Sequence, residues 1–115
     1  MIESLSLSHL ALPARDPEKL RQWYVDHFGC KSKGAQLWCN GSVITIMAGT
    51  PIVNEHWHFG FRLRSPEQLQ LWHQRLLDQS LEPSKLEDYG DYQTFSVKDL
   101  EGNDIEFFFE DEPDA

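Results

Sequence analysis

Two histidines and one glutamate in this chain have the side-chain types and the positions needed to hold a metal ion. His9 and His58 each begin a segment of period-two apolar alternation, and Glu106 lies in the last such segment. Because successive side chains of a strand point to opposite faces, all three are expected on the face away from the apolar core. Two imidazoles and a carboxylate on one face bind iron(II), manganese, zinc or nickel and leave coordination positions open. A lone strand histidine is more often structural or exposed, so the prediction of a metal centre depends on their joint placement.

An internal repeat places His9 and His58 at equivalent points of two similar segments. With these histidines aligned, residues 9–23 and 58–72 carry the same amino acid at six of fifteen positions. Self-similarity of this kind indicates two copies of one supersecondary unit.

Each copy contains the same local signals in the same order. A capping residue followed by proline predicts the start of a helix at Asp16 and again at Ser65. Turn signals then follow at Asn40–Gly41 and Gly102–Asn103. The strands expected around these turns are Gln36–Asn40, Val43–Met47, Thr94–Lys98 and Asp104–Phe109, with further short strands around Ser32–Gly34 and Ser84–Leu86.

These elements predict an α+β fold made of two tandem β-α-β-β-β modules. They would form a cupped mixed sheet, with the helices on its outer face and a groove on the other. The 115 residues suit one domain. Module one is expected at about 4–50 and module two at about 56–110, followed by an acidic, solvated tail at 111–115.

Two further residues are candidates for moving a proton in the predicted groove. His56 precedes His58 by two residues and is expected on the same face, where it would be a ligand, a partner of a ligand, or an exposed loop residue. His58 is favoured as the ligand because the repeat pairs it with His9. Tyr92 and Tyr89 flank a glycine in a loop and would either donate to a ligand or be ordinary loop aromatics.

Three residues are candidates for contacts with a substrate. Arg62 is expected on the face of His58, where a cation would suit an anionic substrate; the alternative is an exposed arginine beside the acidic tail. Trp38 and Phe108 would line the groove with aromatic surface.

The bulk composition excludes some partners and favours a compartment. The formal net charge of −9 disfavours binding to nucleic acid and to anionic membranes. No apolar run is long enough to span a bilayer, and the first residues do not resemble a signal peptide. We therefore expect a soluble, cytoplasmic protein, with Cys30 and Cys39 as reduced structural thiols.

Three motifs in order resemble the vicinal-oxygen-chelate superfamily of glyoxalases, bleomycin-resistance proteins and extradiol dioxygenases. They are Ser8–Leu12 with Asp16–Lys19 and His27–Gly29, then His58–Leu63, and last Asp99–Glu106. The resemblance implies the paired β-α-β-β-β fold and one divalent metal ion held by His9, His58 and Glu106. It also implies a homodimer, in which His9 of one chain joins the other two ligands in its partner.

Departures from the best-known members narrow the activity that the resemblance implies. Thr45 stands opposite Glu106 in the repeat, where glyoxalase I has a fourth ligand, so a typical glyoxalase I is not expected. Ala11 replaces a threonine of the fosfomycin-inactivating transferases, and Ser96 replaces the catalytic tyrosine of ring-cleaving dioxygenases.

The sequence therefore favours a metal-dependent enzyme acting on a small oxygen-bearing molecule. The alternative is a metal-free protein that sequesters a small molecule, as bleomycin-resistance proteins do. Retention of two histidines and an acid favours the enzyme, because a binder does not need them to converge.

Overall fold

The computed structural model describes residues 1–113 and divides the chain into two compact units, Met1–Ile52 and Val53–Ala115. Asp114, part of the predicted acidic tail, lies outside the described residues.

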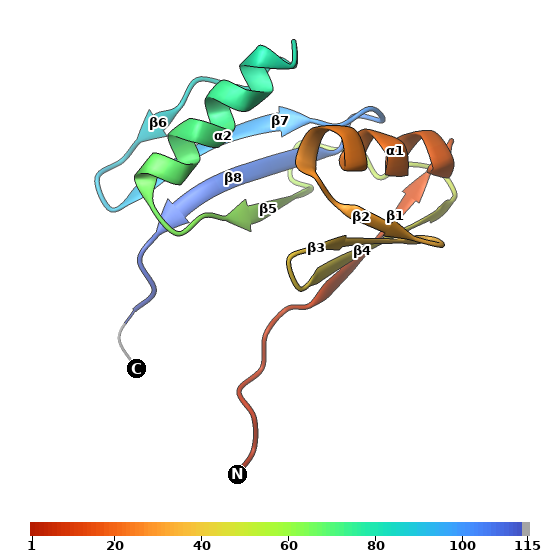
Figure 1. Cartoon of the computed structure of the whole chain (residues 1–115), viewed down its shortest axis with the longest axis horizontal. Coiled ribbons are helices and arrows are strands. Elements are labelled where there is room, and N and C mark those ends of the chain that lie inside the picture. The colour runs from red at the N-terminus through yellow and green to blue at the C-terminus, as the bar shows by residue number, and fades with distance from the viewer. Residues whose placement is uncertain (114–115) are drawn as a thin grey trace. The chain divides into compact units, whose positions relative to one another are not determined.

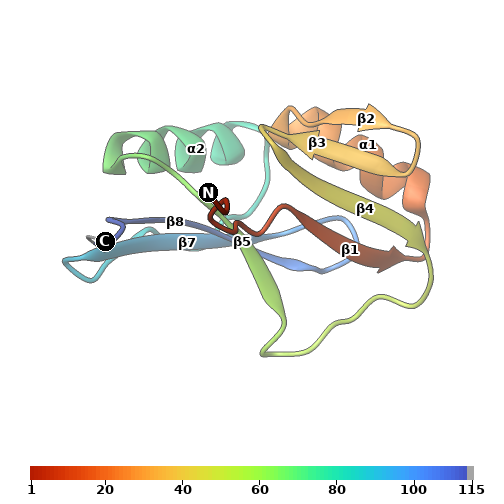
Figure 2. The same ribbon diagram turned by 90° about the horizontal axis from the view of Figure 1, so that it is seen from below.

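The first unit is a four-stranded mixed sheet with one helix on one face (Figures 1 and 2). Its sheet order is β1-β4-β3-β2, with β1 parallel to β4 and the other pairs antiparallel. Its elements are β1 (His9–Ala14), α1 (Pro17–Phe28), β2 (Lys31–Lys33), β3 (Gln36–Cys39) and β4 (Ser42–Ala48).

Helix α1 begins and ends where the local chemistry requires. The Asp16 side chain accepts a hydrogen bond from the Lys19 backbone amide, and Pro17 occupies the first helical position. Gly29 ends the helix at φ 72°, a left-handed conformation that glycine adopts without steric cost. The helix buries three apolar side chains against the sheet: Leu20, Trp23 and Tyr24.

The second unit repeats this arrangement strand for strand. Its sheet order is β5-β8-β7-β6, again with only the first pair, β5 and β8, parallel. Ser65 caps α2 by accepting from the Gln68 amide. The elements are β5 (His58–Arg62), α2 (Pro66–Asp78), β6 (Glu87–Asp88), β7 (Tyr92–Lys98) and β8 (Asp104–Glu110).

These two units confirm the predicted α+β class and the tandem β-α-β-β-β modules, with each module forming its own sheet. One short strand was misplaced, because β6 is Glu87–Asp88 rather than Ser84–Leu86. Ser84 still bonds to the sheet, since its amide donates to the Ser96 carbonyl and its hydroxyl accepts from the Ser96 amide.

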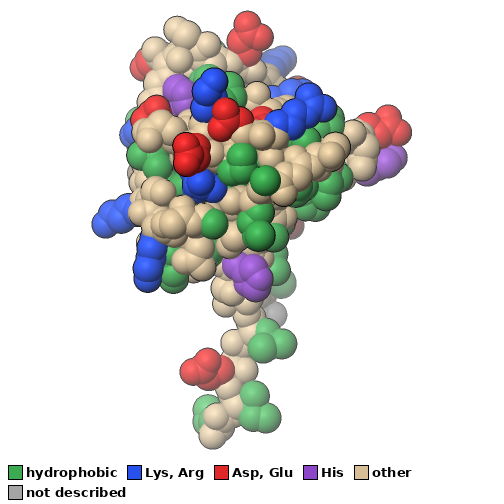
Figure 3. Space-filling view, turned by 90° about the vertical axis from the view of Figure 1, so that its right-hand side faces the viewer, with side chains coloured by type: hydrophobic (Ala, Val, Ile, Leu, Met, Phe, Trp, Pro, Cys, Tyr) green, Lys and Arg blue, Asp and Glu red, His purple; other side chains and the backbone are tan. Residues whose placement is uncertain are grey.

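Acidic and basic side chains are interspersed on the face shown in Figure 3, so the net charge of −9 does not form one continuous patch there. Among the described residues, no helix is both long and apolar enough to cross a membrane.

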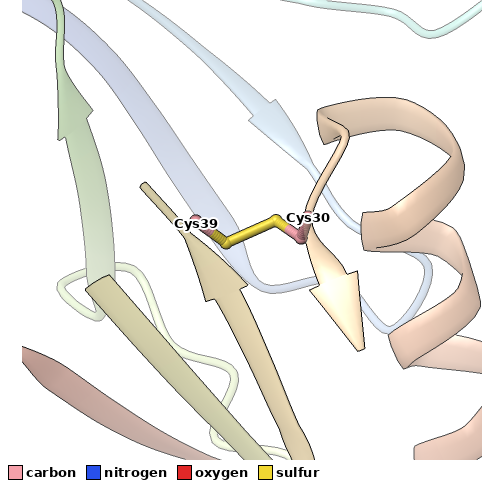
Figure 4. Close-up of a disulfide and its surroundings, with 2 residues drawn as sticks. All are labelled: Cys30 and Cys39. Atoms are coloured by element: carbon pink, nitrogen blue, oxygen red, sulfur yellow. A yellow bond between two sulfur atoms is a disulfide. The ribbon is translucent and has the colours of Figure 1, made fainter. Parts of the chain in front are cut away.

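The prediction of two reduced thiols is wrong in this structure, because Cys30 and Cys39 form a disulfide (Figure 4). Cys30 immediately precedes β2 and Cys39 ends β3. The ladder of this hairpin pairs Lys31 with Trp38, and the cysteines lie one step further along it, with Cα atoms 4.9 Å apart. That separation is within the usual range for a disulfide. Sequence spacing did not reveal the pair, because only the hairpin register brings the two residues together.

Reduction of this disulfide is expected to lower the free energy of unfolding by about 2–3 kcal/mol, the chain-entropy value for closing a short loop. Urea unfolding with and without reductant measures the difference. The double variant Cys30→Ala/Cys39→Ala is the control and should not respond to reductant. Equal stability of the wild type in both conditions would argue against the disulfide.

Candidate metal centre

The exposed face of the second sheet carries two of the three predicted metal ligands. On the opposite face, Ile105 and Phe107 are buried, and Phe107 packs against Trp72 of α2. Strand alternation therefore turns His58 of β5 and Glu106 of β8 to the side away from the helix.

The side chains of His58 and Glu106 lie close together, and one nitrogen of the imidazole faces one oxygen of the carboxylate. The Nε2 atom of His58 is 3.9 Å from Oε1 of Glu106. The other carboxylate oxygen, Oε2, accepts hydrogen bonds from the Tyr92 hydroxyl and from the Thr94 hydroxyl, the latter at 2.7 Å. The two hydroxyls thus hold one oxygen of Glu106 and leave the other directed at the imidazole.

Tyr92 acts here as a hydrogen-bond donor. Burial raises the pKa of its hydroxyl, and the hydrogen bond to Glu106 raises it further. Tyr92 therefore keeps its proton at neutral pH and shares that proton with Glu106. The contacts of Tyr92 are those of a residue that orients a carboxylate, and its role in moving a proton stays a prediction.

An open hollow of about 210 Å³ lies beside His58 and Glu106. It adjoins a larger one of about 620 Å³ that includes Lys98. Among the described residues, those that line the smaller hollow include three carboxylates and no lysine or arginine. Its lining is His58, Ser84, Glu87, Thr94, Phe95, Ser96, Asp104 and Glu106.

Gly60 lies directly opposite Glu106 in the parallel pairing of β5 with β8. A Cβ atom at this position would lie 2.7 Å from the Glu106 carbonyl oxygen and 3.2 Å from its Cβ. The glycine therefore allows the backbone of β5 to approach the strand that carries the carboxylate.

The register of the first sheet agrees with the alignment of the repeat. There Ala11 pairs with Thr45, as Gly60 pairs with Glu106. Thr45 thus occupies the place of the carboxylate in module one.

His9 and Trp38 share one face of the first sheet. Each is paired across strands with Val43, which places all three side chains in one row. Trp38 is 42% exposed, and its indole N–H donates to the Gln36 side chain. His9 and the pair of His58 and Glu106 belong to different units. Within residues 1–113, no group of three or more histidine, cysteine, aspartate or glutamate side chains lies gathered around a possible ion position.

The structure places His56 in a turn before β5, so the strand alternation used to predict its direction does not extend to it. Its imidazole is exposed, with Nε2 3.2 Å from Oε1 of Glu55. Its backbone amide donates to the Asn54 side chain.

Arg62 and Phe108 lie on the exposed face of the second sheet, but their contacts differ. The Arg62 guanidinium donates twice to the Glu110 carbonyl, at 2.8 and 3.0 Å, and lies 3.8 Å from the Glu112 carboxylate. These contacts match the alternative interpretation, in which Arg62 is an exposed arginine beside the acidic tail. Phe108 lies beside Tyr92, with ring centroids 6.0 Å apart.

Sequence reasoning missed Thr94, Glu87 and Gly60 as parts of this site. Alternation along β7 puts Thr94 on the same face as Tyr92. If the predicted strand had begun at Tyr92, the alternation of its side chains would have been sufficient to place Thr94 in the site.

Tandem β-α-β-β-β modules, each with one helix on a four-stranded mixed sheet, are the vicinal-oxygen-chelate fold. Residues 6–107 match the model of the Glyoxalase/Bleomycin resistance protein/Dioxygenase superfamily, and the chain belongs to that superfamily.

Three solved structures have a similar fold. A possible glyoxalase from Bacillus cereus is 25% identical at a TM-score of 0.75, over 90% of this chain and 98% of that one. A lactoylglutathione lyase from Agrobacterium tumefaciens is 17% identical at a TM-score of 0.72, over 90% and 92%. A fosfomycin resistance protein from Listeria monocytogenes is 18% identical at a TM-score of 0.75, over 96% of each chain. No curated protein matches the sequence.

Gly60→Ala is expected to lower the free energy of unfolding. The added Cβ would press on the backbone and side chain of Glu106, and overpacking of this kind costs about 1–3 kcal/mol. Ala11→Gly at the equivalent position of module one is the control, expected to cost about 0.5–1 kcal/mol. Urea unfolding measures both, and a Gly60→Ala protein as stable as the wild type would contradict the close approach.

Proposed function

We propose that this chain is a divalent-metal-dependent enzyme acting on a small oxygen-bearing molecule. The observation that carries the proposal is the pairing of His58 with Glu106, whose carboxylate is oriented by two hydroxyls beside an open hollow. His58 and Glu106 would supply two ligands. His9 would supply the third, from the same chain or from the second copy in a homodimer.

The two donor atoms lie close enough for a single ion to join them after a small movement of the side chains. Zinc lies about 2.0–2.2 Å from nitrogen and oxygen ligands, so two of its ligands at the tetrahedral angle are about 3.4 Å apart. The 3.9 Å between His58 Nε2 and Glu106 Oε1 is slightly longer than that. Imidazole and carboxylate also suit iron, manganese and nickel, so the donor set does not select one metal.

A metal ion bound here would act as a Lewis acid toward oxygen atoms of the substrate. The residues of this chain would do the remaining work. Tyr92 and Thr94 fix the direction of Glu106, and the hydroxyls of Ser84 and Ser96 line the hollow beside it. Thr45 in place of a carboxylate supports an activity other than that of a typical glyoxalase I.

The proposal places the enzyme in the cytoplasm, as one domain built from two modules. Cytoplasmic proteins rarely keep disulfides outside redox sensing and catalysis. The Cys30–Cys39 bond would then be reduced, or formed only transiently, in that compartment.

A metal-free binding protein is the second candidate function. It is favoured by the absence of a gathered group of three ligand-type side chains in the described part of the chain. The same polar hollow would then hold the small molecule without a metal ion.

His58→Ala and Glu106→Gln are expected to lower the affinity for zinc by more than about a hundredfold. Loss of partners that merely support a ligand already costs 10–100-fold, so loss of a ligand should cost more. Isothermal titration of metal-free protein with zinc, manganese, nickel and iron(II) measures the affinity.

His56→Ala is the matched histidine control for this titration. Its imidazole is exposed and contacts Glu55, so the variant should bind zinc like the wild type. A wild-type protein that binds none of the four metals would overturn the enzyme proposal and leave the binding protein.

The charge of the hollow predicts a preference for cationic over anionic ligands. Glu87 and Asp104 line it together with Glu106, so three carboxylates outweigh the two charges of one divalent ion, and Arg62 is engaged by Glu110 and Glu112. Zinc-loaded protein should bind dopamine at least several-fold more tightly than dihydroxyphenylacetate, which presents the same vicinal hydroxyls with a carboxylate in place of the aminomethyl group.

Titration calorimetry at low and high salt measures this preference. Glu87→Gln should reduce it, whereas Glu18→Gln, with the same charge change on α1, should leave it unchanged. Equal affinities for the two probes would show that the acidic lining does not select the ligand.

A further inference from the structure

The hydrogen bonds around Glu106 determine which of its oxygens is available. A carboxylate oxygen has two lone pairs in the plane of the group. In Glu106, Oε2 accepts from the Tyr92 hydroxyl and from the Thr94 hydroxyl, so both of its acceptor positions are used. Oε1 faces His58 instead, at 3.9 Å from Nε2.

The sheet does not impose this orientation by register alone. The residue directly opposite Glu106 on β7 is Ser96, whose hydroxyl lies 3.4 Å from that of Ser84. The hydroxyls that hold Glu106 come from two and four residues earlier on β7, at Thr94 and Tyr92. The Glu106 side chain therefore leans along the strand toward these two donors.

We propose that Tyr92 and Thr94 are positioning residues that make Glu106 a metal ligand through one oxygen, Oε1. This inference rests on the proposed metal centre. A carboxylate that binds a metal ion through both oxygens takes two coordination positions. When hydrogen bonds occupy Oε2, the Glu106 carboxylate binds only through Oε1 and takes one position. The clamp formed by the two hydroxyls thus keeps a position open for an oxygen of the substrate, as a catalytic site requires.

The test is the affinity of the metal-free protein for cobalt(II), together with the visible spectrum of the bound ion. Thr94→Val removes one donor and keeps the shape of the side chain, and Tyr92→Phe removes the other. Each is expected to lower cobalt affinity about 10–100-fold, as loss of a hydrogen bond to a ligand does. Each should also change the visible spectrum of bound cobalt, because a second carboxylate oxygen changes the coordination number.

The chain offers a matched control for each variant. Thr94→Ser keeps the hydroxyl and should restore both the affinity and the spectrum. Tyr89→Phe removes the hydroxyl of the exposed tyrosine that stacks on Tyr92 at 6.3 Å and should bind cobalt like the wild type. The urea unfolding midpoint of each variant shows that an effect on cobalt is not a general loss of folding.

Three outcomes would overturn the inference in distinguishable ways. If Thr94→Val and Tyr92→Phe match the wild type in affinity and spectrum while Glu106→Gln does not bind cobalt, the metal centre stands and the clamp is wrong. If Thr94→Ser is as weak as Thr94→Val, the role of residue 94 is packing rather than hydrogen bonding. If the wild type binds no cobalt, the metal centre and the clamp are both wrong.

Discussion

The parallel pairing of β5 with β8 is the constraint on which the candidate site depends. This pairing sets Gly60 opposite Glu106 and brings the His58 imidazole to the same face. The backbones of the two strands can come this close only because position 60 has no side chain. On its other side, β8 pairs with β7, which supplies the two hydroxyls that hold Glu106. One carboxylate is thus fixed from both neighbouring strands.

Module one has an equivalent strand pairing but carries different side chains. Its register is equivalent, with Ala11 opposite Thr45, but no carboxylate stands at that position. Gln36 lies opposite Thr45 on β3, in the place that Ser96 holds opposite Glu106 on β7. Module one retains the histidine of the repeat and lacks the oriented acid. If a metal centre forms, its two best-positioned donors therefore come from module two.

Strand alternation and the repeat were sufficient to predict the fold class and the faces of His58 and Glu106. Alternation is a local property, so a short apolar pattern reveals it without knowledge of the tertiary structure. The contact of Glu106 with Tyr92 depends on the register of the hairpin that joins β7 and β8. That register depends on the five-residue connection Asp99–Asn103, where the Asp99 carboxylate accepts from two backbone amides and from the Asn103 side chain. The predicted strands Thr94–Lys98 and Asp104–Phe109 leave this same connection, but the first of them was begun two residues late, which left Tyr92 in a loop.

The contacts of His56 and Arg62 could not be predicted for a similar reason. His56 was assigned a face on the assumption that β5 extends back to it, whereas the strand begins at His58 and the preceding residues form a turn. Arg62 does lie on the expected face, but the carbonyl of Glu110 occupies its guanidinium. The face of the sheet to which a strand side chain points can be predicted from the sequence. The partner that a long polar side chain contacts on that face depends on the neighbouring chain segments.

When it is formed, the disulfide joins the two strands of the first hairpin covalently, in addition to their hydrogen bonds. Strand β2 has three residues and β3 has four, and such short strands are weakly held at their ends. The Cys30–Cys39 bond closes the open end of this hairpin next to Trp38. Trp38 pairs across the sheet with Val43, which pairs in turn with His9. The covalent link lies one residue pair beyond this row, next to the aromatic side chain that shares a face with the third predicted ligand. The two modules thus differ beside their candidate ligands: the first has a cysteine pair that can close the end of its hairpin, and the second has hydroxyl donors that hold a carboxylate.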